Sequence, residues 1–303
     1  MNFKHIISSL LVFITLAACA NTPEKPEANS LLWKISGNGL EKPSYLLGTH
    51  HLVPLSFIDS IAGIDEAFEA TEQTIGELDM SKMNELQAQI MSGAMMPAEY
   101  SYQTLLNEAD FQLLDKTLKE LIGMGLDQLG RMRPAMLSNL ISLTLYQKYY
   151  PNLAGAISID QHFQDEATKR SRPVQSLETA EEQIFALLGS QTIERQAEML
   201  ACMINHPDML KDQMDRLQTA YMNQDLKALN DLYEEELPDD PCPTTQEEKD
   251  VMNKNRNVKW LKTLPGMMQE KSSFIAVGSL HLVGKDGLIE GLRKAGYKVE
   301  AVR

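Results

Sequence analysis

Two histidines in this sequence each follow a short apolar run and a glycine. The first copy spans residues 45–54 and places His51 three positions after Gly48; the second spans 275–284 and places His281 three positions after Gly278. Both copies continue with Leu-Val and a turn residue. A short apolar run that ends in glycine is typical of a buried strand leaving a sheet. We therefore expect each histidine just past the carboxyl end of a strand, where α/β sheets hold their ligands.

The two copies lie 230 positions apart, from 51 to 281, which excludes a tandem repeat. They suggest two related halves of one sheet, each delivering one imidazole to a shared cleft. The alternative is two unrelated strands that each end in glycine with a capping histidine. His50 precedes His51, but the second copy has Leu280 at that position. A duplicated function would use the shared position, so His51 and His281 rank ahead of His50.

Glu77 supplies a candidate carboxylate at the end of residues 74–80, which we expect to form the next strand. In a parallel sheet that strand would end at the same edge as the two histidines. Two imidazoles and a carboxylate suit a divalent transition metal such as Mn, Co or Zn. Such an ion lowers the pKa of bound water and polarises a carbonyl. The alternative is a solvated acid at a strand end.

Other catalytic signatures do not occur in the sequence. It contains no His-Glu-x-x-His, no Gly-x-Ser-x-Gly and no P-loop motif. The formal net charge is −14, from 28 Lys and Arg against 42 Asp and Glu, so we expect no nucleic-acid partner.

The first residues predict export and a lipid anchor. Lys4 and His5 precede an apolar run, and Leu-Ala-Ala-Cys ends at Cys19. That ending resembles the bacterial lipobox, which implies a signal peptide over 1–18, lipid on Cys19 and a flexible tether over 19–30. We expect a protein of the bacterial cell envelope, anchored in the outer membrane and facing the periplasm; the alternative is a plain cleaved signal.

Cys202 and Cys242 would then be the remaining thiols in an oxidising compartment, which permits a disulfide between them.

The pattern of apolar residues predicts an α/β (α+β) fold over residues 31–303. Strands near both chain ends would form a central mixed sheet, and a large helical insertion would separate them. The expected strands are 31–36, 45–49, 74–80, 173–177, 272–277 and 298–302. The expected helices are 57–71, 107–122, 135–150, 157–169, 179–188, 190–232 with a break near Pro207, 247–268 and 286–295.

These motifs, in this order, resemble the TraB/GumN family, whose relatives include the Tiki metalloproteases. The resemblance covers about residues 31–303. It rests on residues 48–51, 76–79, 131–134, 159–163, 173–179, 256–257, 276–284 and 296–300. It implies an α/β fold, Gly-x-x-His and glutamate as the site, and metal-dependent proteolysis for the Tiki branch. The sequence departs from the common pattern at His50, which either adds a ligand or shifts the pKa of its neighbours.

The resemblance makes His51, Glu77 and His281 the metal-ligand candidates. Arg256 would bind a substrate carboxylate or stabilise an oxyanion, unless it is a surface arginine. Glu178 and Arg133 are expected in buried structural ion pairs. The first functional hypothesis is a membrane-tethered, metal-dependent hydrolase that cleaves peptides or proteins. The alternatives are a non-catalytic haem- or peptide-binding lipoprotein that uses the same cleft, and an interaction lipoprotein with a decayed site.

Overall fold

A computed structural model describes residues 29–152 and 157–303 of the protein. The predicted signal peptide, Cys19 and most of the predicted tether lie outside the described residues. Within them, no helix is long and apolar enough to cross a membrane.

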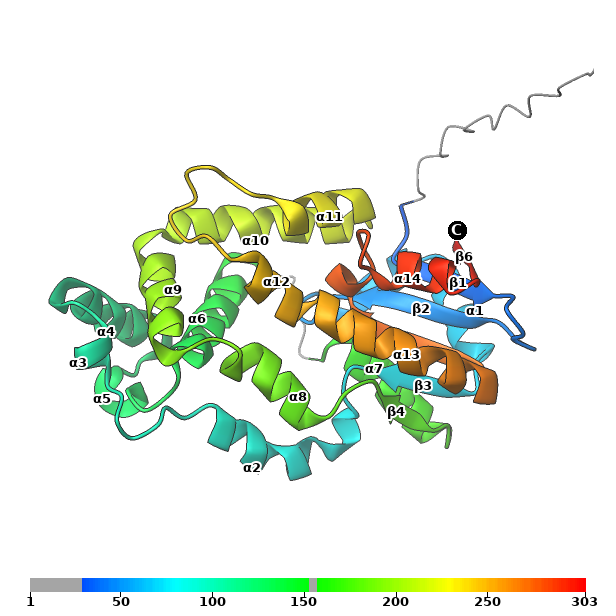
Figure 1. The fold of residues 1–303 in the computed structure, drawn as a ribbon, viewed down its shortest axis with the longest axis horizontal. Helices are drawn as coiled ribbons and strands as arrows, with labels where there is room; N and C mark the ends of the chain where they lie inside the picture. The colour runs from blue at the N-terminus through cyan, green and yellow to red at the C-terminus, as the bar shows by residue number, and fades with distance from the viewer. Residues whose placement is uncertain (1–28, 153–156) are drawn as a thin grey trace, which may run out of the picture.

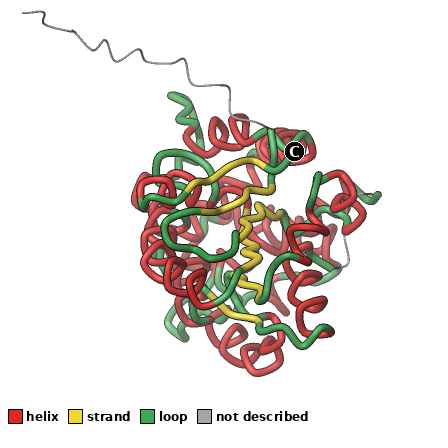
Figure 2. The backbone as a smooth tube through the Cα atoms, turned by 90° about the vertical axis from the view of Figure 1, so that its right-hand side faces the viewer, coloured by secondary structure: helices red, strands yellow, loops and turns green. Residues whose placement is uncertain are grey.

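Six strands form one mixed sheet, as the sequence predicts. Its order is β4-β3-β5-β2-β1-β6, and Figure 2 shows these strands running through the middle of the molecule with helices around them. The four strands from β4 to β2 are parallel, whereas β1 runs antiparallel to β2 and β6. The strand bounds are β1 Leu32–Ser36, β2 Ser44–Thr49, β3 Gln73–Gly76, β4 Val174–Ser176, β5 Ser273–Gly278 and β6 Lys298–Ala301.

Apolar side chains pack helices against this sheet. Phe68 of α1 (Ile64–Glu69) and Phe163 of α7 (Ile159–Lys169) both contact Phe274 of β5, with ring centroids 5.3 and 4.5 Å away. Helices α13 (Lys254–Glu270) and α14 (Leu288–Lys294) lie across the front of the sheet in Figure 1. This packing fixes the strand ends from which the candidate site is built.

The helical insertion leaves the sheet after β3 and builds a second apolar core. Leu114, Leu137 and Leu200 are fully buried in it. They come from α4, α6 and α9, which lie away from the sheet in Figure 1. α7 and β4 return to the sheet before the chain continues through further helices. The α-helices between β3 and β5, besides α7 and α13, are α2 Met83–Gly93, α3 Tyr102–Leu105, α4 Glu108–Ile122, α5 Leu126–Leu129, α6 Pro134–Tyr149, α8 Ala180–Ile184, α9 Ile193–Asn205, α10 Pro207–Met222, α11 Leu226–Glu234 and α12 Gln246–Met252.

Cys202 of α9 and Cys242 of the loop before α12 form the predicted disulfide, with their Cα atoms 5.7 Å apart. The bond ties the proline-containing acidic loop to the insertion.

Three predicted elements were wrong in their bounds. Residues 57–71 form a 3-10 helix, Leu55–Ser60, and then α1, because Ile61 is extended and Gly63 has a left-handed φ of 70°. The predicted helix 247–268 is two helices, because Asn253 leaves helical geometry at φ −131° and ψ −71°. The predicted strand 74–80 ends at Gly76, where Glu77 turns toward the neighbouring strand.

Candidate active site

The carboxyl ends of four parallel strands lie along one edge of the sheet. His51 follows β2, His281 follows β5, Glu77 follows β3 and Glu178 follows β4. β2 and β5 are direct neighbours, with Gly48 paired to Val277, so the two motifs lie side by side with a shift of one residue. Topology therefore brings together residues from opposite ends of the chain.

Arg256 of α13 is the centre of the hydrogen-bonded cluster. Its Nη2 lies 2.6 Å from Oε2 of Glu77 and 2.6 Å from Oε1 of Glu178. Its Nε donates to the other oxygen of Glu178 at 3.0 Å, and its Nη1 donates to Nε2 of His281 at 3.0 Å. The guanidinium carbon lies 4.8 Å from the centroid of the Trp260 ring. The arginine is buried in the site, so it is not the surface residue of the alternative interpretation.

Glu77 is held as an ionised carboxylate. Its Oε1 accepts the Gly278 backbone N–H at 2.8 Å, and its Oε2 accepts from Gln183 at 3.2 Å as well as from Arg256. Burial alone would raise the pKa of Glu77, but Arg256, the Gly278 N–H and His281, which is protonated in the acidic range where Glu77 titrates, outweigh burial and hold the pKa at about 2. Because Glu77 uses the Gly278 N–H, that amide is not free to bind a substrate oxygen.

His281 is buried and neutral at pH 7. Burial lowers the pKa of His281 to about 4. Its Nδ1 lies 2.8 Å from Oδ1 of Asn257, and its Nε2 lies 3.9 Å from Oε1 of Glu77. The ring also packs on Trp260, with centroids 4.4 Å apart.

His51 is more exposed and pairs with a carboxylate. Its Nδ1 lies 3.0 Å from Oδ1 of Asp160, in the first turn of α7. This hydrogen bond raises the pKa of His51 to about 9, with smaller effects from the charges of Glu77 and Arg256. The charges of Glu77 and Arg256 shift the pKa of both His281 and His51, so the two imidazoles share one electrostatic environment.

His50 lies outside this cluster. Its ring packs between Tyr146 of α6 and Tyr221 of α10, with centroids 6.0 and 5.3 Å away, and its Nδ1 accepts the Leu52 N–H. Burial lowers the pKa of His50 to about 4. His50 therefore joins the helical insertion to the strand edge.

The imidazole nitrogens of His51 and His281 and the carboxylate of Glu77 are ligand types that divalent transition metals bind. Asp160 and Asn257 each occupy Nδ1 of a histidine, which leaves Nε2 for a metal, and this outer partner is usual for metal-binding histidines. Arg256, however, contacts both Nε2 of His281 and Oε2 of Glu77. No group of three His, Cys, Asp or Glu side chains within the described ranges is spaced to hold an ion. Arg256 would have to move away from His281 and Glu77 before these donors could hold one.

The two predicted ion-pair residues differ. Glu178 is buried and binds Arg256 through both oxygens, as expected. Arg133 instead donates to the Leu188 carbonyl at 3.3 Å and forms no ion pair with any described residue, so that prediction was wrong. Its place before α6 positions the guanidinium beside a helical carbonyl rather than a carboxylate.

Sequence reasoning missed Asp160, Asn257 and Gln183 as partners of the site. The first two lie within the family motifs at 159–163 and 256–257, which was the available signal. Gln183 of α8 has no motif of its own.

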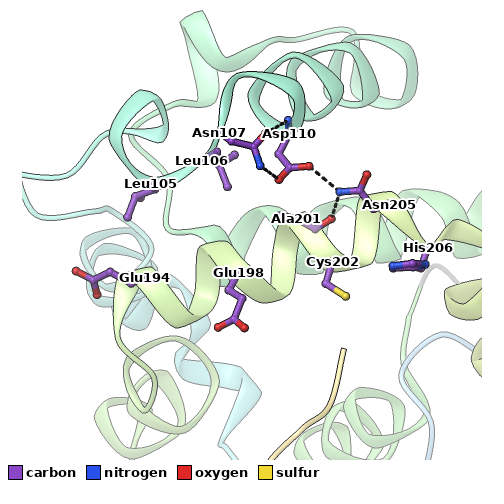
Figure 3. Close-up of a pocket in the computed structure, with 10 residues that line it drawn as sticks. All are labelled: Leu105, Leu106, Asn107, Asp110, Glu194, Glu198, Ala201, Cys202, Asn205 and His206. Carbon is purple, nitrogen blue, oxygen red and sulfur yellow. Dashed lines mark hydrogen bonds between the residues drawn. The ribbon is translucent and has the colours of Figure 1, made fainter. Parts of the chain in front are cut away.

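A cavity of about 640 Å³ lies elsewhere, between α4 and α9 (Figure 3). Asp110, Glu194 and Glu198 make its lining acidic, and Cys202 and His206 also border it. We call His51, Glu77, Glu178, Arg256 and His281 the strand-edge cluster, and none of them lines this cavity. This cavity is therefore separate from the chemistry described above.

The sheet and its strand-edge cluster define an α/β protein with histidine, glutamate and arginine at one site. The chain belongs to the TraB/PrgY/gumN family, whose sequence profile matches residues 31–301. It is similar to "Metalloprotease TIKI1" of Xenopus tropicalis, with 24% identity over 332 residues, covering 93% of this chain and 63% of that protein. It is also similar to "Metalloprotease TIKI2" of Danio rerio, with 23% identity over 328 residues, covering 93% and 62%. The chain thus spans less than two thirds of the length of these relatives. No solved structure matches it.

Proposed function

We propose that the protein is a membrane-tethered, metal-dependent hydrolase that cleaves peptide bonds. This proposal is supported by the placement of His51, His281 and Glu77 after three adjacent parallel strands that end along one edge of the sheet, with Nδ1 of each histidine already engaged. The relatives named metalloproteases support the same reaction class.

His51, His281 and Glu77 would hold the ion, which is Mn, Co or Zn. When bound, such an ion lowers the pKa of a water and polarises a carbonyl. Glu77 is already ionised, and neutral His281 offers a lone pair, so neither must lose a proton first. His51 must give up its proton at Nε2 to become a ligand, and Asp160 keeps the other nitrogen protonated.

Arg256 would bind the negative charge of the substrate. Once it leaves His281 and Glu77, Glu178 still anchors it through Nε and Nη2, and Nη1 keeps its bond to the Met252 carbonyl. The Nη1 hydrogen that faced His281 then becomes free to donate. A buried guanidinium that donates to a developing oxyanion acts in a low dielectric, where that contact is strongest. The substrate would be a peptide or protein whose scissile carbonyl faces this group.

The proposed cellular location rests on the first 30 residues of the sequence. Residues 1–18 would direct export, and lipid on Cys19 would hold the domain near the membrane through residues 19–30. The enzyme would then face the periplasm from the outer membrane and act on envelope peptides or proteins.

The test compares metal content and cleavage of a peptide library in protein purified without a His tag. Wild type should contain a transition metal and lose activity with a chelator. His51→Ala, Glu77→Gln and His281→Ala should each abolish metal binding and cleavage, because each removes one of the three ligands of the ion. His206→Ala is the matched control, because His206 is exposed between α9 and α10 and away from the site. Equal cleavage by wild type and His51→Ala under added Mn, Co or Zn would refute the proposal, and the cleft would then be a binding site.

A further inference from the structure

Asn257 is a fully buried amide beside His281, at the start of α13. Its Oδ1 lies 2.8 Å from Nδ1 of His281. Its Nδ2 lies 2.8 Å from Oδ1 of Asn253, 3.2 Å from the His281 carbonyl and 3.0 Å from the Asp286 carbonyl. Both the oxygen and the NH₂ group of the amide therefore have hydrogen-bond partners.

These neighbours decide which way the amide points. The two backbone carbonyls can only accept, so the NH₂ group must face them. Asn253 agrees, because its own Nδ2 donates to the Leu280 carbonyl at 2.8 Å and leaves its Oδ1 as the acceptor. The Oδ1 of Asn257 therefore faces His281, and Nδ1 of His281 must carry the hydrogen.

Arg256 requires the same tautomer from the other side of the ring. Its Nη1 lies 3.0 Å from Nε2 of His281, and a guanidinium has no acceptor. A proton on Nε2 would set two N–H donors against each other and leave Oδ1 of Asn257 facing a lone pair. Two independent contacts thus exclude the alternative tautomer.

We infer that Asn257 is a positioning residue that fixes His281 as the Nδ1–H tautomer and turns its Nε2 lone pair toward Glu77 and Arg256. Asn253 holds the amide in that orientation, which the break between α12 and α13 at this residue permits. The Nε2 lone pair is the atom that a metal would need. The binding of a metal by this lone pair rests on the proposed function, whereas the assignment of the tautomer does not.

The experiment is imidazole nitrogen–proton correlation NMR on metal-free protein labelled with ¹⁵N-histidine, with His281 assigned by its loss in His281→Ala. Wild type should carry its proton on Nδ1, and a proton on Nε2 would overturn the inference. Asn257→Leu should lose the single Nδ1–H form, whereas Asn257→Asp should keep the proton on Nδ1, because a carboxylate restores the acceptor that faces it. Asn205→Leu is the control, because Asn205 bonds Asp110 and the Ala201 carbonyl in the insertion.

A second readout is the Kd for Co²⁺, measured by its visible absorption. Asn257→Leu should weaken binding about 10–100-fold, the usual effect of losing such a partner, and Asn257→Asp should recover most of it. An unchanged tautomer in folded Asn257→Leu would refute the role of Asn257. If Asn257→Leu does not fold, loss of the Nδ1 proton in Asn257→Asp gives the same refutation. If the tautomer holds but no peptide is cleaved, only the proposed function fails.

Discussion

Arg256 is the cation that compensates two carboxylates in the interior of the strand-edge cluster. Its side chain is 11% exposed, and those of Glu77 and Glu178 are 14% and 2% exposed. Arg256→Met removes the charge while an unbranched side chain still packs on Trp260. The variant therefore tests the electrostatic role of the arginine with little loss of packing.

The expected cost comes mainly from Glu178. Both of its oxygens accept from Arg256, and without that cation it is a buried, unpaired carboxylate. Removing one member of a buried pair costs about 3–5 kcal/mol, against a total stability of about 5–15 kcal/mol. With a urea slope of about 3 kcal/mol/M, the unfolding midpoint should fall by about 1–1.7 M. Glu77 adds less, because it keeps its bonds from Gly278 and Gln183.

The deficit should depend on pH with a definite sign. Burial raises the pKa of Glu178 even while Arg256 opposes it, and losing the guanidinium raises that pKa further. A carboxyl whose folded pKa exceeds its unfolded value of about 4.3 binds its proton more tightly in the folded state. The free energy of unfolding of Arg256→Met therefore recovers as the pH falls from the folded pKa of Glu178 toward its unfolded pKa. The loss of stability relative to wild type should be larger at pH 8 than at pH 5.

Urea unfolding followed by tryptophan fluorescence at pH 8 and pH 5 measures both effects. Lys227→Met is the matched control, because Lys227 and Asp231 are 82% and 58% exposed, and it should change stability by less than about 1 kcal/mol. Adding Glu178→Gln to Arg256→Met should recover part of the loss at pH 8. Arg256 does not compensate the buried charge of Glu178 if Arg256→Met is as stable as Lys227→Met at pH 8, or if the stability deficit of Arg256→Met does not change with pH.

Three further predictions concern other parts of the chain. Reducing the Cys202–Cys242 bond should cost about 4 kcal/mol for a loop of 40 residues, and an unchanged urea midpoint in reductant would contradict this. Asp160→Asn should lower the pKa of His51 from about 9 toward its ordinary value near 6.5, because the charged hydrogen bond is lost; an NMR titration that still gives about 9 would exclude Asp160 as the cause. Cys19→Ser should release the protein from the membrane fraction, and intact mass spectrometry that finds an unlipidated mature N-terminus elsewhere would end the lipid-anchor prediction.

The strands were predictable because their signals are local. The run before Gly48 and the run before Gly278 each form a strand that ends at the glycine or one residue after it, and parallel pairing then brings the two strands together. The break at Gly63 was not predictable from periodicity, because apolar residues continue at helical spacing on both sides of it. The break at Asn253 has no glycine or proline beside it to mark it in the sequence. Backbone geometry at a single residue interrupted both helices.

The partners of the site depend on how helices pack, which no spacing along the chain reports. Arg256 was a candidate from its motif, but its position between Glu77 and Glu178 depends on how α13 packs against the sheet. Asp160 reaches His51 from α7, and the two residues are 109 positions apart. A hydrogen bond of this kind leaves no periodic signal in either segment.

The two motif histidines look equivalent in the sequence but differ in the fold. His281 lies under α13, where Asn257 and Trp260 enclose it and an uncharged amide holds its Nδ1. His51 lies at the exposed side of the same edge, where the carboxylate of Asp160 favours a positive ring. A carboxylate partner stabilises an added proton, whereas an amide partner in a buried position does not. The duplicated motif therefore delivers one imidazole suited to carry a proton and one suited to offer a fixed lone pair, because different helices cover the two strand ends.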